Sequence, residues 1–177
     1  QYAVDNNLHV MQPEKLKAEE FVNELRSLNA DLFIVVAFRM LPEVVWAMPP
    51  LGTFNLHGSL LPQYRGAAPL NWAVINGEKE TGITTFFLTH EIDTGKIIQQ
   101  EKIAINEEDN VGTIHDKLMV MGGDLVLDTV KNIIAGTVKP KPQEELYASE
   151  SELKPAPKIF KETCHLDFNN PTENIHN

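Results

Sequence analysis

Two polar side chains near the first third of the chain, Asn55 and His57, have the types and spacing of a catalytic pair. They open residues 55–66, which read Asn-Leu-His-Gly-Ser-Leu-Leu-Pro-Gln-Tyr-Arg-Gly. If the apolar run that leads into them is a strand, side chains alternate between its faces, and both residues project to one side. An amide can hold a developing oxyanion, and an imidazole can move a proton near neutral pH. By itself the triplet is also compatible with an incidental pair of polar residues.

A second polar segment, residues 89–95, could supply a carboxylate to this pair. Its end at 93–95, Asp-Thr-Gly, is typical of a turn, so one interpretation is a plain connector between strands. In the other interpretation, Asp93 approaches the imidazole, fixes its tautomer and supports its protonated form. His90 and Glu91, together with Asp93, are potential metal ligands, but the rest of the sequence supplies no matching cluster. We therefore expect no metal site.

The elements that must position these residues alternate between helix and strand. Apolar residues at three- and four-residue spacing predict a helix over 18–28, and the β-branched run 32–37 predicts a strand buried on both faces. The other expected elements are a helical turn over 42–46, a strand ending at His57, a helix over 67–75 closed by Asn76-Gly77, strands over 83–88 and 96–105, and a long helix between Asn110 and Gly136. This order predicts an α/β, Rossmann-like fold with a mostly parallel, doubly wound sheet flanked by helices. Ligands of such sheets bind beyond the carboxyl ends of the strands, where the catalytic pair would lie.

Composition indicates a globular protein of the cytoplasm. The chain has 177 residues, 42% of them hydrophobic, which is enough for one domain with a sizeable core. We expect no membrane-spanning helix and no signal peptide, and the single cysteine, Cys164, suits a reducing compartment. The net charge of −10 counts against a general nucleic-acid-binding domain. Because the chain starts at Gln1 without a visible cap, we expect it to be a piece of a longer protein.

Nearly the whole chain resembles a known family, the folate-dependent formyltransferases. The segments that carry the resemblance are 54–66, 67–69 (Ala-Ala-Pro), 77–82 (Gly-Glu-Lys-Glu-Thr-Gly), 93–95 and 114–118. The resemblance implies a formyltransferase fold truncated at both ends. Residues 1–145 would be part of the catalytic domain, and residues 146–177 a linker toward a C-terminal β-barrel domain.

The resemblance also implies roles for individual residues. The catalytic residues would be Asn55, His57 and Asp93, without a metal. The folate pocket would be formed by Ser59, Leu60, Leu61 and Pro62, by Phe38, Arg39, Met40 and Leu41 on one wall, and by Glu91 and Ile92 on the other. Arg65 and Gly66 would meet the acceptor, although an arginine in water is an equal alternative for Arg65. The Tyr-Gly pair usual in the family is replaced by Phe38-Arg39, so Arg39 either covers the pocket or points to solvent.

Within the family, the chain is most similar to the branch that formylates initiator methionyl-tRNA. The resemblance implies transfer of a formyl group from 10-formyltetrahydrofolate to the amino group of methionyl-tRNA, by direct amine attack through a tetrahedral intermediate. Most contacts with tRNA would lie outside this chain, and no membrane would be involved. The alternatives are a sugar-nucleotide N-formyltransferase and a folate-binding fragment without activity of its own. Glycinamide ribonucleotide as acceptor is disfavoured by Gly58, where that group typically has proline.

Overall fold

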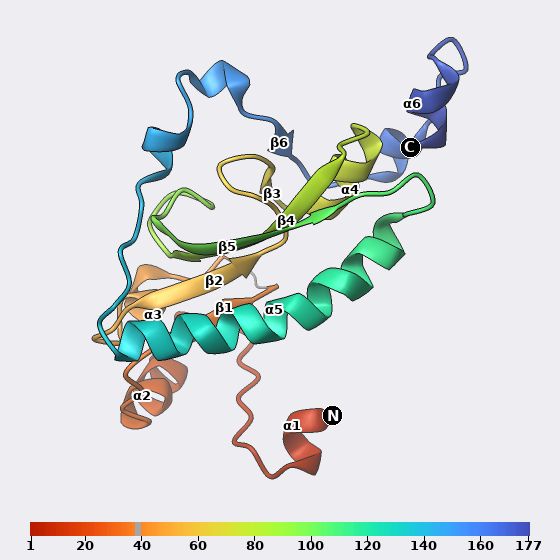
Figure 1. Ribbon diagram of the computed structural model, residues 1–177. Coiled ribbons are helices and arrows are strands. Elements are labelled where there is room, and N and C mark those ends of the chain that lie inside the picture. Colours follow the sequence, from red (N-terminus) through yellow and green to blue (C-terminus); the bar gives the residue numbers. More distant parts are fainter. Residues whose placement is uncertain (38–39) are drawn as a thin grey trace. The chain divides into compact units, whose positions relative to one another are not determined.

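Figure 1 shows the computed structural model of the chain, which describes residues 1–37 and 40–177. The chain divides into two compact units. One unit comprises residues 1–33 and 38–53, and the other comprises residues 34–37 and 54–177. The predicted catalytic residues, from Asn55 to Asp93, therefore all belong to the second unit.

The described residues of the first unit form the short helices α1 (Tyr2–Asp5), α2 (Glu19–Ser27) and α3 (Glu43–Trp46). The predicted helix over 18–28 and the predicted turn over 42–46 are confirmed by α2 and α3. Helix α2 buries Val22 and has two glutamates in its first turn, where the positive end of the helix dipole stabilises them. Helix α1 is absent from the sequence prediction, because four residues carry too little periodicity to reveal a helix.

A four-stranded sheet with the order β1-β2-β4-β5 forms the centre of the second unit. Its strands are β1 (Phe33–Val36), β2 (Thr53–His57), β4 (Glu80–Phe87) and β5 (Ile97–Ala104). β2 pairs with β4 so that His57 lies opposite Thr84. A separate two-stranded sheet joins β3 (Arg65–Gly66) to β6 (Pro155–Ala156). All four strands expected from the sequence are confirmed by β1, β2, β4 and β5.

The α/β class is confirmed, but the strand directions differ in part from the prediction. A mostly parallel sheet was expected, whereas β2 runs antiparallel to β4, and β4 runs antiparallel to β5. Only residues 88–96 connect β4 to β5, which is too short for the crossover that a parallel pair requires. Parallel pairing does occur between β3 and β6, which are far apart in the sequence.

Strand β1 is less buried than predicted. Val35 is 8% exposed, whereas Ile34 and Val36 are 47% and 56% exposed. Because successive side chains of a strand point to opposite faces, the described residues cover only one face of this strand. A continuous apolar run thus predicts the strand itself, but not a covering layer on each side of it.

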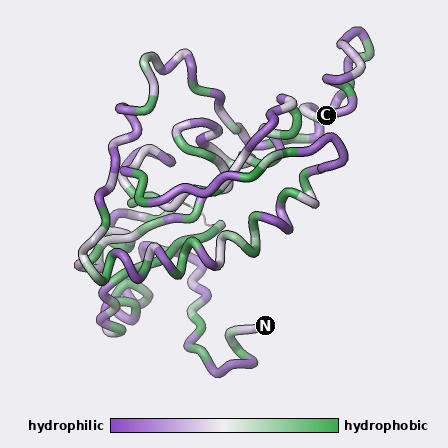
Figure 2. The backbone as a smooth tube through the Cα atoms, in the orientation of Figure 1, coloured by the Kyte–Doolittle hydropathy of each residue, from purple (hydrophilic) through white to green (hydrophobic). Residues whose placement is uncertain are grey.

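Helix α5 (Val111–Ile134) follows the N-cap Asn110 and lies along the sheet of the second unit (Figure 1). Its buried face includes Ile114 and Leu118, which pack with Ile83 of β4. Figure 2 shows hydrophobic and hydrophilic residues alternating along this helix, as expected for a helix with one face on a core. The predicted long helix is confirmed.

Shorter elements complete the second unit. α4 (Pro69–Ile75) confirms the predicted helix over 67–75, and Gly77, with φ of 63°, follows its end. The remaining elements are the 3₁₀ helices η1 (Gln143–Leu146), η2 (Glu150–Glu152) and η3 (Lys161–Cys164), and helix α6 (Thr172–His176). Because β6 pairs with β3, the first part of the expected linker 146–177 packs within this unit.

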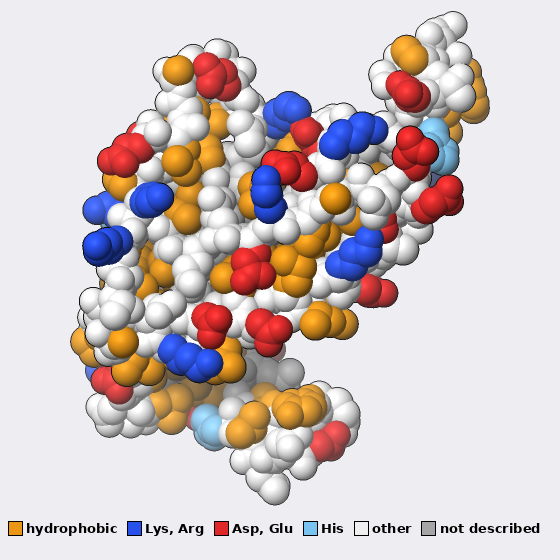
Figure 3. Space-filling view, viewed as in Figure 1, with side chains coloured by type: hydrophobic (Ala, Val, Ile, Leu, Met, Phe, Trp, Pro, Cys, Tyr) orange, Lys and Arg blue, Asp and Glu red, His pale blue; other side chains and the backbone are white. Residues whose placement is uncertain are grey.

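Acidic and basic side chains are intermixed on the face of the molecule shown in Figure 3, where no continuous basic area appears. Over the described residues, no helix combines the length and the apolar character needed to cross a membrane.

Candidate active site

Strand β2 places Asn55 and His57 on the same side of the sheet, as the two-residue spacing predicts. Both residues are buried, with 4% and 6% of their surface exposed. Phe86 of β4 lies edge-on to the imidazole, with the ring centroids 6.3 Å apart and the planes at 86°. Polar contacts with the imidazole are strengthened in such surroundings, because little water is present to compete with them.

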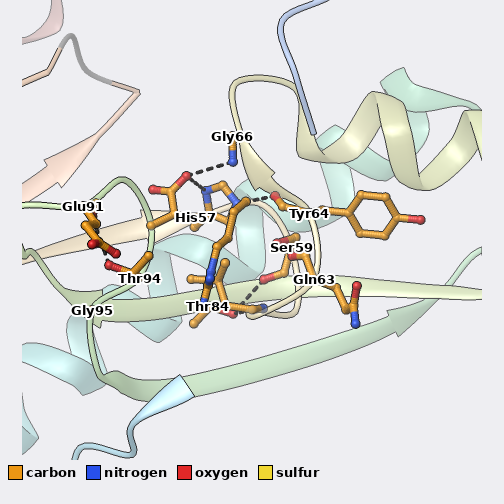
Figure 4. A network of polar contacts seen from close by, with 12 residues as sticks. His57, Ser59, Gln63, Tyr64, Gly66, Thr84, Glu91, Thr94 and Gly95 are labelled. Carbon is orange, nitrogen blue, oxygen red and sulfur yellow. Dashed lines mark hydrogen bonds and ion pairs between the residues drawn. The ribbon is translucent and has the colours of Figure 1, made fainter. Parts of the chain in front are cut away.

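The imidazole of His57 lies between a backbone carbonyl and a carboxylate (Figure 4). Nε2 is 2.9 Å from the carbonyl oxygen of Tyr64, and Nδ1 is 3.8 Å from Oδ2 of Asp93. A carbonyl only accepts, so Nε2 donates to it and carries a proton. The predicted approach of Asp93 to the imidazole is confirmed, but the tautomer is fixed by Tyr64. The carboxylate faces the other nitrogen, where it can stabilise the imidazolium form.

Tyr64 is held at several points, which fixes the carbonyl that His57 contacts. Its φ is 61°, and its backbone N–H donates to the carbonyl of Lys154 at 2.6 Å. The hydroxyl donates to Glu78 and accepts from Asn76 Nδ2 at 3.1 Å. Burial raises the pKa of Tyr64 to about 12, and the hydrogen bond to Glu78 acts in the same direction. The hydroxyl therefore remains a donor at neutral pH.

The turn that carries Asp93 is fixed by contacts with its backbone and its side chain. Asp93 has φ of 55°, an uncommon conformation for a residue other than glycine. Its Oδ2 accepts a hydrogen bond from the backbone N–H of Gly66 at 3.0 Å. Gln143 donates to the carbonyls of Asp93 and Gly95 at 2.9 and 2.8 Å. A Cβ at Gly95 would lie 1.6 Å from the carbonyl oxygen of Phe87, so only glycine fits there.

The segment predicted to bind folate, Ser59 to Pro62, directly follows β2 and contains a cis peptide bond between Leu61 and Pro62. The side chains of Ser59 and Leu61 are turned inward, with 0% and 2% exposed. Thr84 donates to the carbonyl of Ser59 at 2.6 Å and accepts from the N–H of Leu61 at 3.1 Å. Gln100 donates to the carbonyl of Leu61 at 2.8 Å. The backbone of the segment is thus fixed beside the catalytic pair, and folate binding there stays a prediction.

The other predicted pocket residues are distributed more widely. Phe38 and Arg39 lie outside the described residues. Met40 and Leu41 belong to the first unit, where Met40 is exposed and Leu41 half-buried. The pterin wall expected from residues 38–41 therefore stays a prediction.

Glu91 and Ile92 lie exposed in the turn before Asp93, so they are near the carboxylate but not packed against it. Arg65 points its Nε and Nη2 toward Oε1 of Gln143, at 3.0 and 2.7 Å. Its guanidinium carbon is 5.9 Å from the ring centroid of Tyr147. The structure gives Arg65 partners within the protein, and its contact with an acceptor stays a prediction.

Three residues near the site are missed by the sequence prediction. Gln143 stands in a Pro- and charge-rich stretch, Tyr64 contributes a backbone carbonyl, and Thr84 lies inside an apolar strand. None of these has a local signal, because their contacts span 7 to 50 residues. Over residues 1–37 and 40–177, no group of three or more His, Cys, Asp or Glu side chains is arranged to hold a metal ion.

One buried polar atom in the site has no hydrogen-bond partner among residues 1–37 and 40–177. Among the described residues, none donates a hydrogen bond to Oδ1 of Asn55. A buried acceptor without a donor costs about 1–3 kcal/mol, so such atoms are often found where a ligand completes the hydrogen bonding. Together with the His57–Asp93 contact, this arrangement offers an amide, an imidazole and a carboxylate to a bound reactant.

Comparisons with known proteins identify the family of the chain. The family described as formyl transferase matches residues 2–130. The methionyl-tRNA formyltransferases of Parabacteroides distasonis and Phocaeicola vulgatus are 66% and 68% identical over 176 residues, which is 99% of this chain. The chain spans 54% of the length of each of these curated relatives.

The fold is shared with WlaRD, a sugar 3N-formyl transferase solved in the presence of dTDP and 5-N-formyl-THF. The TM-score is 0.73 at 20% identity, over 99% of this chain and 59% of that one. At 20% identity, the structural similarity to WlaRD shows only that the two chains share a fold. The family itself is shown by the match to residues 2–130. The chain belongs to the formyl transferase family.

Proposed function

We propose that the intact protein transfers a formyl group from 10-formyltetrahydrofolate to the amino group of initiator methionyl-tRNA. The names of the relatives at 66–68% identity support this acceptor, and the formyl-THF in the WlaRD structure supports a folate donor. Such a reaction belongs to translation initiation in the cytoplasm. Residues 146–177 would begin a connection toward a C-terminal β-barrel domain.

The observation that carries the proposal is the meeting of Asn55, His57 and Asp93 in one buried site. The imidazole and the carboxylate are 3.8 Å apart, and the amide oxygen beside them has no donor in the described part of the chain. Formyl transfer to an amine needs a group for the oxyanion, a group for the proton and a group that stabilises the charged base. These three side chains can fill the three roles.

In the proposed mechanism, the neutral amine attacks the formyl carbon and a tetrahedral oxyanion forms. The amide N–H of Asn55 donates to this oxyanion, an interaction worth roughly 3–4 kcal/mol in a water-poor site. Its Oδ1, which has no donor among the described residues, can accept from the attacking amine. As the bond to the folate nitrogen breaks, the proton lost by the amine passes to that nitrogen through His57. Because Nε2 donates to Tyr64, Nδ1 is the nitrogen left for the exchange.

Folate is proposed to bind against the Ser59–Pro62 segment, with Glu91 and Ile92 at the edge. The backbone of this segment is fixed by Thr84 and Gln100, so it offers a rigid surface beside the catalytic pair. A rigid surface limits the ordering cost of binding.

Formyl-transfer assays on the intact protein test the proposal. With 10-formyltetrahydrofolate as donor, we expect methionyl-tRNA to be formylated and amino-sugar nucleotides to remain unmodified. Transfer to the sugar alone would replace the acceptor in this proposal. Calorimetry with a folate analogue tests the alternative of a folate-binding module without activity. Binding of the analogue without turnover of any acceptor would indicate such a module.

A further inference from the structure

We propose that Gln143 is a positioning residue, which holds the turn of Asp93 so that the carboxylate faces His57. This inference rests on the proposed function, in which Asp93 stabilises the protonated imidazole during formyl transfer. Gln143 lies outside the strands and loops that carry the three catalytic residues, and it reaches their site from η1.

The carboxamide of Gln143 is fully buried and uses its donors on the Asp93 turn. Its Nε2 donates to the carbonyl of Asp93 at 2.9 Å and to the carbonyl of Gly95 at 2.8 Å. A primary amide has two N–H donors, so both are engaged. The two carbonyls flank Thr94, and a single side chain therefore fixes both ends of the turn.

The other end of the same carboxamide is fixed by Arg65. Its Oε1 accepts from Nε and Nη2 of Arg65, at 3.0 and 2.7 Å. Hydrogen bonds from a charged donor are stronger than those between neutral groups. Arg65 is followed by Gly66, whose N–H donates to Oδ2 of Asp93 at 3.0 Å. Gln143 thus contacts both Asp93 and Arg65, and Asp93 in turn contacts Gly66, the residue after Arg65.

The Asp93 turn combines an uncommon backbone conformation with exposed residues, so a support from outside the turn bears on its place. Asp93 has φ of 55°, which is strained for a residue with a side chain. Ile92 before it is 61% exposed and adds little packing. The hydroxyl of Thr94 makes its hydrogen bonds with Thr89 and the carbonyl of Glu91, within the same turn. Gln143, on the backbone of the turn, and the N–H of Gly66, on the carboxylate, thus act together to keep Oδ2 of Asp93 3.8 Å from the imidazole.

The substitution Gln143→Glu in the intact protein tests this role. A glutamate has the same size and still accepts from Arg65, but its carboxylate cannot donate to the two carbonyls. We expect kcat to fall by roughly 10- to 100-fold, the range seen when a supporting contact of a catalytic group is lost, with a small change in KM for the folate. Gln143→Met removes the contacts with Arg65 and with the two carbonyls. If the glutamate variant does not fold, kcat of the methionine variant is compared with that of the wild type instead.

A double-mutant cycle with Asp93→Asn separates positioning from general destabilisation. If Gln143 acts through Asp93, Gln143→Glu causes little further loss of kcat once Asp93 has lost its charge. An equal loss in both backgrounds would overturn the proposal. Gln99→Met is the matched control, because the carboxamide of Gln99 contacts Thr129 of α5 instead of the site. It should lower stability and leave kcat unchanged.

A spectroscopic readout makes the test independent of turnover. In protein labelled with ¹⁵N-histidine, the ring signals of His57 in Gln143→Glu should move toward those of Asp93→Asn at the same pH. Unchanged His57 signals would overturn the positioning role. If methionyl-tRNA is not formylated by the wild type while these signals still move, the acceptor is wrong and the positioning role stands.

Discussion

At the scale of single residues, the candidate site is a small set of polar atoms with few alternatives for their contacts. His57 has one nitrogen on the carbonyl of Tyr64 and the other facing Asp93. Asn55 presents an amide oxygen without a donor among the described residues. These contacts make each side chain separately testable, because each would act on a different charge or proton of the reaction.

Removing either member of the catalytic pair should lower turnover strongly. We expect His57→Ala and Asn55→Ala each to reduce kcat by at least ~100-fold in the intact protein, since one loses proton transfer and the other an oxyanion donor. Turnover is measured with methionyl-tRNA and folding with circular dichroism. His115→Ala, on the exposed surface of α5, is the matched control and should retain full activity. Rates near wild type for either variant would remove that residue from the mechanism.

Asp93→Asn should isolate the charge of the carboxylate from its shape. The amide can still accept from the N–H of Gly66, so we expect the turn to persist while kcat falls by about 10-fold or more. The pH profile of kcat should change as well, because the charge that stabilises the imidazolium of His57 is gone. A profile identical to the wild type would contradict coupling between the two side chains.

Tyr64→Phe should destabilise the protein in a pH-dependent way. The pKa of Tyr64 is raised by burial from its ordinary 10.0 to about 12. Its contribution to stability is therefore complete below pH 10 and is lost as the pH rises from 10 to about 12. Below pH 10 we expect a loss of about 1 kcal/mol or more, because Glu78 and Asn76 lose a buried partner.

Urea unfolding at pH 8 and pH 11.5 measures this effect, and the difference between wild type and variant should shrink at the higher pH. A constant difference would show that the hydroxyl contributes nothing through its ionisation. Because the carbonyl of Tyr64 contacts His57, the variant also reports whether the tyrosine side chain affects turnover.

At the scale of elements, the local sequence predicts which helices and strands form, but predicts less well how the strands pair. The helices α2, α4 and α5 are predicted correctly, with the N-cap Asn110 of α5 and Gly77 after α4, as are the strands β2, β4 and β5. The directions of β2 against β4 and of β4 against β5 are not, because strand alternation is the same in parallel and antiparallel sheets. The exposure of Ile34 and Val36 in β1 is also missed, because an apolar run does not show whether other elements cover both faces of the strand.

The N-cap of α5 is an element-scale test. Oδ1 of Asn110 accepts from the N–H groups of Gly112 and Thr113, at 2.9 and 3.1 Å. We expect Asn110→Ala to reduce the free energy of unfolding by about 0.5–2 kcal/mol, the usual effect of losing such a cap. Asn110→Asp should restore most of it, because a carboxylate accepts the same bonds. Turnover at low temperature should be unchanged, and a large loss of kcat would mean that α5 contributes to the site.

At the scale of the whole molecule, charge sets the expectation for tRNA. The formal net charge is −10, and the face in Figure 3 shows acidic and basic side chains intermixed. Phosphate contacts supply much of the affinity of proteins for nucleic acids, and they require a basic surface. Because this chain is acidic overall, we expect tRNA to bind mostly through segments outside it.

A polypeptide of these 177 residues should bind methionyl-tRNA at least ~10-fold more weakly than the intact protein, at equal salt. Fluorescence anisotropy at two salt concentrations measures both affinities, and circular dichroism establishes that the shorter polypeptide is folded. Equal affinities with equal salt dependence would place the tRNA surface within this chain and contradict the prediction.

The sequence by itself determined the chemical groups and most of the elements that carry them. Helix caps, apolar periodicity and the two-residue spacing of Asn55 and His57 depend on neighbours in the chain, so they are readable without coordinates. Only the tertiary structure decided that Tyr64 fixes the tautomer of His57 and that Gln143, 50 residues away, supports the turn of Asp93. Such contacts arise when distant segments pack together, and no local pattern of residues encodes them.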